Sequence, residues 1–151
     1  PYEYDCIVKN HKNGEYSVFY NIQRTGNFKT HVMNEDTPIL GSPFDTLLEA
    51  GLVSADHSSA AGKGLVDSQA GSSVSFSIIT RDKVKNAIDH GGAEVRVEIF
   101  GGSSPVAKVV DNNDGSYLVS YTLGWADTYH IEIYLNNVKL DGSPFTITAR
   151  E

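Results

Sequence analysis

Apolar and polar residues alternate with a period of two along much of this chain. The pattern is clearest between 111 and 145, where Tyr117, Val119 and Tyr121 alternate with polar or outward residues. A second alternating run follows from Tyr129 to Leu135, and a period of two is typical of strands with one buried face. The segment 112–115, Asn-Asn-Asp-Gly, favours a tight hairpin turn before these strands. The pattern therefore predicts successive antiparallel strands.

The same arrangement occurs earlier in the chain at a constant offset of 101 residues. This offset takes Gly14 to Gly115 and the Gly-Ser-Pro-Phe segment at 41–44 to the one at 142–145. It also relates the strand residues Tyr16, Val18 and Tyr20 to Tyr117, Val119 and Tyr121. A period near one hundred residues indicates tandem all-β domains and is too long for a solenoid unit.

Together these motifs resemble the filamin-type immunoglobulin repeat. The Asn-Asp-Gly turn, the Tyr-x-Val-x-Tyr strand and the closing Gly-Ser-Pro-Phe carry the resemblance, and 62–65, 70–71, 76–78 and 91–92 extend it upstream. It implies an all-β fold with a complete immunoglobulin-like seven-stranded β-sandwich over 62–151. The second half of another repeat, strands D–G, is expected over 1–50, with an inter-repeat joint over 51–61.

In the complete repeat we expect strand A over 64–66, strand B over 73–80, strand C over 94–99 and strand D over 105–110. The first repeat would lack strands A–C, and four strands with one apolar face are not stable alone. We therefore expect either that the chain is an excerpt of a longer one or that the half repeat associates with another molecule.

The composition and net charge of the chain exclude several classes of function. The chain is 40% hydrophobic and 21% charged, which is ordinary for a folded domain, and its net charge of −7 disfavours nucleic acid and anionic membranes. No apolar run is long enough to span a membrane, so no membrane insertion is expected. Cys6 is the only cysteine, which excludes an internal disulfide and favours a reducing, cytoplasmic compartment.

The sequence offers no candidate catalytic residue, cofactor site or metal site. The acidic turn at 111–115 resembles a calcium loop, but with Gly115 at the sixth position Val110 and Tyr121 would stand where oxygen ligands are needed. The five histidines are scattered, and no serine lies in a nucleophile elbow. Trp125, between two strands, is expected to cover the end of the core.

The resemblance implies a non-enzymatic structural and interaction module, a rod repeat of a filamin-like actin cross-linking scaffold in the cytoskeleton. Actin would be bound only through domains outside this chain. Peptide tails could pair with the C–D edge, whose outward residues are expected to be Arg96, Glu98, Ala107 and Val109. Because Arg96 and Glu98 are charged, the edge either binds nothing or prefers a charged ligand. A cell-surface adhesion ectodomain and a spacer in a ligase are the alternatives.

Overall fold

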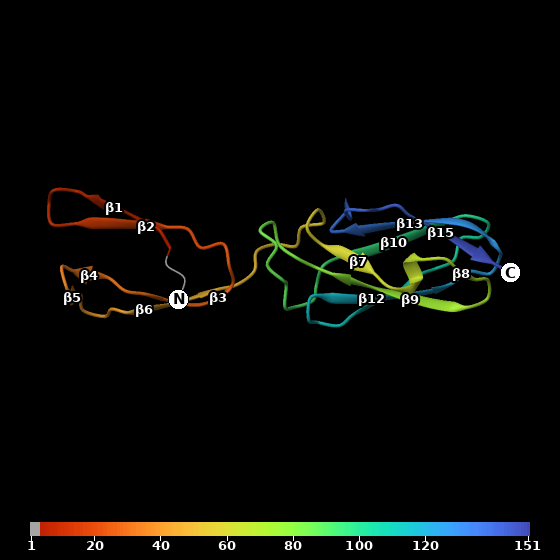
Figure 1. Cartoon of the computed structure of the whole chain (residues 1–151), viewed down its shortest axis with the longest axis horizontal. Helices are drawn as coiled ribbons and strands as arrows, with labels where there is room; N and C mark the ends of the chain where they lie inside the picture. The colour runs from red at the N-terminus through yellow and green to blue at the C-terminus, as the bar shows by residue number, and fades with distance from the viewer. Residues whose placement is uncertain (1–3) are drawn as a thin grey trace. The chain divides into compact units, whose positions relative to one another are not determined.

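The computed structural model describes residues 4–151, so residues 1–3 of the expected first repeat lie outside the described part. The chain divides into two compact units, Pro1–Leu48 (unit 1) and Glu49–Glu151 (unit 2). Both are built from strands, as Figure 1 shows, and the expected all-β class is confirmed. No helix within 4–151 has the length and apolarity needed to cross a membrane.

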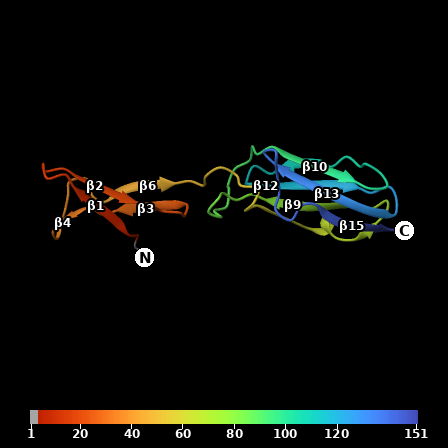
Figure 2. The same cartoon turned by 90° about the horizontal axis from the view of Figure 1, so that it is seen from above.

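Unit 2 is a sandwich of two sheets. One sheet has the order β11-β12-β9-β7, from β11 (Lys108–Asp111), β12 (Ser116–Thr122), β9 (Ser73–Ile79) and β7 (Ser59–Ala61). The other has the order β10-β13-β15-β8, from β10 (Val95–Phe100), β13 (Asp127–Leu135), β15 (Phe145–Arg150) and β8 (Ser68–Gln69). A short β14 (Val138–Lys139) also pairs with β13. Figure 2 shows β10 and β13 lying side by side in one layer.

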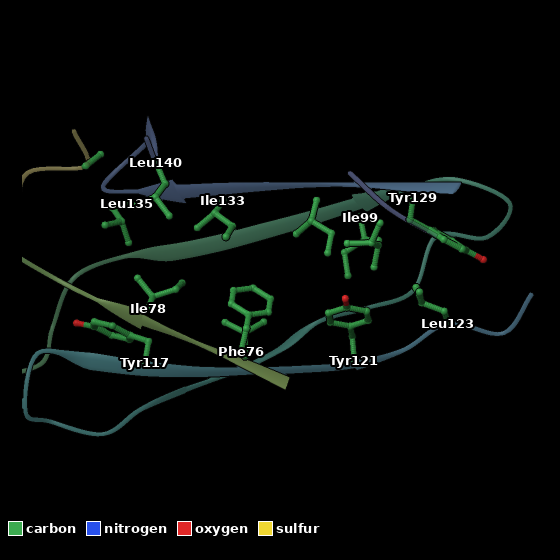
Figure 3. Packing of buried hydrophobic residues seen from close by; sticks show 14 of the residues in the cluster. Phe76, Ile78, Ile99, Tyr117, Tyr121, Leu123, Tyr129, Ile133, Leu135 and Leu140 are labelled. Carbon is green, nitrogen blue, oxygen red and sulfur yellow. The ribbon is translucent and has the colours of Figure 1, made fainter. Parts of the chain in front are cut away.

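Alternating side chains of the two sheets meet in one apolar core. Figure 3 shows Phe76 and Tyr121 pointing from one sheet toward Ile99 and Ile133 of the other. The rings of Phe76 and Tyr121 meet edge to face, with centroids 6.4 Å apart. Offset and edge-to-face ring pairs are the favoured aromatic geometry, because they bring the positive edge of one ring to the negative face of the other. The period-two pattern thus identified the core face of these strands correctly.

Strand A was expected over 64–66, and this prediction is wrong. Residues Lys63–Leu65 form a short 3-10 turn, η1, which connects β7 to β8. β7 pairs with β9 in one sheet, and β8 pairs with β15 in the other. The turn lets the chain pass from one sheet to the other. It also lies close against β9, since a Cβ on Gly64 would come within 3.0 Å of Phe76 Cδ1.

The segment 51–61, which was predicted to be the joint between repeats, folds as part of unit 2. Ala55 is buried in the sandwich core, and the end of the segment pairs with β9 as β7. The Gly51 amide donates to Asp82 Oδ2 at 3.0 Å, and the Arg81 amide donates to Ser58 Oγ at 3.0 Å. Small and polar residues therefore fill this segment because they fold onto the loop after β9, which composition alone did not show.

Three other strands differ at their ends. Strand B was expected over 73–80, whereas β9 ends one residue earlier, at Ile79. Strand D was expected over 105–110, whereas β11 begins at Lys108 and ends at Asp111. Pro105 has no amide hydrogen to contribute to a ladder, which explains the later start. Strand C begins and ends one residue later than expected, at Val95 and Phe100.

Within residues 4–48, the strands of unit 1 form three two-stranded pairings. They are β1 (Cys6–Asn10) with β2 (Tyr16–Tyr20), β3 (Gly26–Thr30) with β6 (Phe44–Leu48), and β4 (Met33–Asn34) with β5 (Thr37–Pro38). The strands fall where the repeat predicts strands D to G. That unit 1 is the second half of a repeat stays a prediction.

Equivalent turns in the two units contain equivalent hydrogen bonds. The Lys12 amide donates to Asn10 Oδ1 at 2.8 Å, and its counterpart, the Asn113 amide, donates to Asp111 Oδ1 at 2.8 Å. Similarly, Ser42 Oγ accepts from the Val32 amide at 2.9 Å, as Ser143 Oγ accepts from Ile133 at 2.9 Å. The offset of 101 residues is therefore reproduced in local geometry as well as in sequence.

Candidate interaction edge

Strands β10 and β11 each end a sheet of unit 2. In the described chain β10 pairs with β13 on one side, and β11 pairs with β12 on one side. The other side of each strand carries main-chain donors and acceptors without a neighbouring strand. An edge of this kind can accept an extended peptide through main-chain hydrogen bonds.

The outer face of β10 carries a polar network that involves both expected residues of this strand. The Arg96 guanidinium donates to the Glu98 carboxylate and lies 4.0 Å from the centroid of the Tyr134 ring on β13. The Tyr134 hydroxyl donates to Glu132 Oε2 at 2.6 Å, and Lys139 Nζ donates to Glu132 Oε1 at 3.0 Å. Arg96 and Glu98 are thus brought together, and both already have partners within the sheet.

These contacts shift the pKa values of Glu132, Tyr134 and Lys139. Hydrogen bonds from Tyr134 and then Lys139 lower the pKa of the Glu132 carboxyl. The bond to Glu132 raises the pKa of the Tyr134 hydroxyl and of the Lys139 ammonium. Glu132 is therefore charged at neutral pH, and this face carries two cations beside two carboxylates. A ligand chosen by charge would have to compete with these internal pairs.

Ala107 and Val109 do not face outward, so that part of the prediction is wrong. Both are half-buried and pack against the core. Val109 lies directly opposite Val119 of β12, which is buried, and residues opposite each other on antiparallel strands share a face. The outward positions are Val106, Lys108 and Val110. Counting the alternation back from the hairpin turn would have identified them.

Trp125 was expected to cover the end of the core, and this too is wrong, because its side chain is 67% exposed. The end of the core is instead closed by Tyr129, which is fully buried. The Tyr129 hydroxyl donates to the Trp125 carbonyl oxygen at 3.1 Å and lies 3.1 Å from Ser103 Oγ. The loop of Trp125 therefore contributes its main chain to the core boundary, while its ring faces solvent.

The acidic turn after β11 is a hairpin turn whose carboxylates are used internally. Asp111 accepts from the Asn113 amide and, at 2.9 Å, from the Gly92 amide. Asp114 Oδ1 accepts from the Ser116 amide at 2.9 Å. Hydrogen bonds from the Ser116 side chain and amide lower the pKa of Asp114. Across residues 4–151, no group of three or more His, Cys, Asp or Glu side chains is placed to hold a metal ion.

Known proteins similar to this chain share its fold and parts of its sequence. The chain is 36% identical over 81 residues to E3 ubiquitin-protein ligase TRIM45 of Bos taurus, covering 51% of this chain and 14% of that protein. It is 29% identical over 139 residues to Filamin-C of Rattus norvegicus, covering 92% of this chain and 5% of that protein. The chain therefore spans only a small part of the length of these relatives.

Among solved structures, invasin, described as a bacterial integrin-binding protein, superposes with a TM-score of 0.63 at 15% identity. The match covers 98% of this chain and 32% of that one, and at this identity it shows the fold alone. The model of the family described as "Filamin/ABP280 repeat" matches residues 52–146, more than half of the chain. The chain therefore belongs to the Filamin/ABP280 repeat family.

Proposed function

We propose that this chain is a non-enzymatic structural module, part of a rod of filamin-type repeats that spaces and couples functional parts of a longer protein. The family fold is a structural one without catalytic chemistry of its own. The observation that carries the proposal is the interior of unit 2, where large side chains of both sheets fill a continuous apolar core. Close-packed sandwiches of this kind resist deformation, which suits a spacer.

The similarity to Filamin-C favours a cytoskeletal, cytoplasmic rod in which actin is bound by domains outside this chain. The similarity to TRIM45 favours a related role, a spacer repeat in a ligase whose chemistry lies in other domains. An adhesion ectodomain is the remaining alternative, supported by the shared fold of invasin. In all three roles the chain would serve as a folded, non-catalytic module of a longer protein.

Force spectroscopy on the full chain, pulled through handles at its two ends, tests the spacer role. Unit 2 has 103 residues and an extended length of about 340 Å, so its unfolding should lengthen the chain in one cooperative step by that length less the end-to-end distance of the folded unit. Gradual extension without such a step would contradict the proposal. A chain carrying Val119→Asp is the control, because a charge in the centre of the core should remove the step.

Peptide binding at the edge of β10 and β11 is a second candidate function. It is favoured by the free main chain of both strands, and the inward half-buried Ala107 and Val109 would line its β11 side. The internal pairing of Arg96 with Glu98 weighs against selection by charge and leaves main-chain pairing as the source of affinity.

The edge can be tested by adding two ten-residue peptides to the isotope-labelled chain and following the amide chemical shifts by NMR. One peptide alternates Val with Glu, and the other alternates Val with Lys. Amide shifts confined to β10 and β11 would support binding at the edge. Stronger shifts with one peptide would show that the charged network selects the ligand. The absence of shifts with both peptides would contradict binding at the edge and leave the spacer role as the only proposed function.

A further inference from the structure

Two exposed aliphatic side chains of unit 2 line one hollow that includes no residue of β10 or β11. Leu52 is 89% exposed and Val84 is 46% exposed. The hollow has a volume of about 280 Å³, and we call it the Leu52 hollow. Its lining residues, all in unit 2, are Gly51, Leu52, Asp82, Lys83 and Val84. Single exposed apolar side chains are ordinary, whereas apolar side chains gathered around a hollow are typical of contact sites.

Hydrogen bonds between two segments of the chain hold the walls of this hollow in place. The Gly51 amide donates to Asp82 Oδ2 at 3.0 Å, and the Ser54 amide donates to the Arg81 carbonyl oxygen at 2.8 Å. Within the loop after β9, the Val84 amide donates to Asp82 Oδ1 at 3.0 Å. Because the hollow is formed before any ligand arrives, binding would need little ordering of the protein.

Positive charge gathers beside the Leu52 hollow, although the chain as a whole carries a net charge of −7. Arg81, Lys83 and Lys85 fall within five consecutive residues of the loop after β9. Lys83 and Lys85 are exposed, and neither forms an ion pair with another of the described residues. Asp82 offsets part of this charge, but it is 3% exposed and its carboxylate accepts main-chain amides. A ligand would therefore meet the cations first.

We propose that the Leu52 hollow docks a short acidic segment of a partner protein. One bulky apolar side chain of that segment would fill the hollow against Leu52 and Val84, and carboxylates next to it would pair with Lys83 and Lys85. Pockets for drug-sized ligands measure about 300–1,000 Å³, so a smaller hollow suits a single side chain. The inference goes beyond the proposed spacer role and concerns a surface separate from the β10 and β11 edge.

An anionic membrane is the other class of partner that exposed aliphatic and cationic side chains could meet. The chain has 19 acidic residues against 12 lysines and arginines. A broad anionic surface would face this acidic excess as well as the cations of one loop, and the repulsion would weaken attachment. A short peptide would face only the charges around the hollow. The distribution of charge therefore favours a peptide.

Three ten-residue peptides serve as probes for the isotope-labelled 151-residue chain, with binding followed through its amide chemical shifts. The first contains Asp, Glu and Ser around one central Phe, the second has Ala in place of that Phe, and the third has Lys in place of Asp and Glu. The proposal expects shifts at Leu52, Lys83 and Val84 with the first peptide, and binding at least about tenfold weaker with the other two. Raising NaCl from about 0.05 to 0.3 M should weaken the first peptide at least about threefold, because exposed charge pairs are screened.

Matched variants locate the binding site. Leu52→Asp should weaken binding of the first peptide at least about tenfold. Val106→Asp should leave binding unchanged, because Val106 is 90% exposed and lies outside the hollow. Lys83→Glu should weaken binding at least about threefold, whereas Lys63→Glu, the same change at an exposed position outside the hollow, should not. Urea unfolding of each variant verifies that the fold is retained, as expected for exposed positions.

Several results would overturn the proposal. They are the absence of shifts with the first peptide, equal binding of the peptide that lacks Phe, shifts confined to β10 and β11, and equal losses with Leu52→Asp and Val106→Asp. Cosedimentation with vesicles of equal parts phosphatidylcholine and phosphatidylserine that is lost in Leu52→Asp, without peptide binding, would identify a membrane as the partner instead. The force experiment bears only on the unfolding of unit 2, so the spacer role and this docking site can fail independently.

Discussion

Replacement of Tyr121 by alanine is expected to be among the most damaging single changes in unit 2. The Tyr121 side chain is 4% exposed, its ring packs edge to face on Phe76, and its hydroxyl donates to the Gly64 carbonyl oxygen. Removing a buried aromatic ring costs about 3–5 kcal/mol of unfolding free energy, because the lost burial leaves a cavity. Tyr121→Phe keeps the ring and loses only the hydrogen bond, so about 0.5–1.5 kcal/mol is expected.

The matched control is Tyr20→Ala, the same change at the equivalent position of unit 1. Tyr20 is 43% exposed, so the loss should stay below about 1 kcal/mol. Urea unfolding followed by far-ultraviolet circular dichroism measures all three variants. A cost below 1 kcal/mol for Tyr121→Ala, or an equal cost for Tyr20→Ala, would refute the assignment of this face to the core of unit 2.

The same residue predicts an alkaline limit of stability. Burial raises the pKa of Tyr121 to about 12, above the ordinary value of 10.0 that applies in the unfolded chain. The contribution of the neutral hydroxyl is therefore fully present below pH 10 and is lost as the pH rises through about 12. Tyr121→Phe should show a smaller loss of stability over this range, and identical alkaline titrations of the two proteins would contradict the reasoning.

Two further predictions concern the loops of unit 2. Asp82 accepts hydrogen bonds from the Gly51, Val84 and Asn86 amides, so Asp82→Ala should cost about 1.5–3 kcal/mol in urea unfolding, and a cost below 0.5 would contradict this role. Burial alone would raise the pKa of Asp82, but these hydrogen bonds outweigh it and lower the pKa. Stability from Asp82 is thus present above about pH 4 and is lost as the pH falls further, a loss that Asp82→Ala should not show. Trp125→Ala should change stability by less than about 0.5 kcal/mol because the ring is exposed, and a larger loss would show that the ring packs on the core.

The sequence was most informative where a strand has one buried face and ends in a recognisable turn. The alternation in 116–123 and 129–135 predicted β12 and β13, although β13 begins two residues earlier, and the Asn-Asp-Gly turn predicted the hairpin between β11 and β12. The constant offset predicted strands in unit 1 at positions where the structure has them. These features are local, because each residue's face follows from its distance to the turn.

The sequence was least informative where main chain packs against distant main chain. The 3-10 turn at Lys63–Leu65 and the folding of 51–61 onto the loop of Asp82 depend on contacts with residues far along the chain. The prediction for Trp125 was wrong for a related reason, because the neighbouring Tyr129 fills that end of the core. At the β10 edge the sequence shows which residue types are present. The contact of Arg96 with Tyr134 could not be predicted from it, because that contact depends on the register between β10 and β13.

Residue-resolved amide hydrogen exchange of the 151-residue chain tests the central claim most directly, namely that unit 2 is a closed sandwich with a buried core, whereas the equivalent strand residues of unit 1 are exposed. The account predicts that the most protected amides of β9, β12 and β13 exchange only when unit 2 unfolds as a whole. It predicts exchange orders of magnitude faster at the counterpart positions of β2 and β3. Equal protection at Tyr20 and Tyr121 would contradict it.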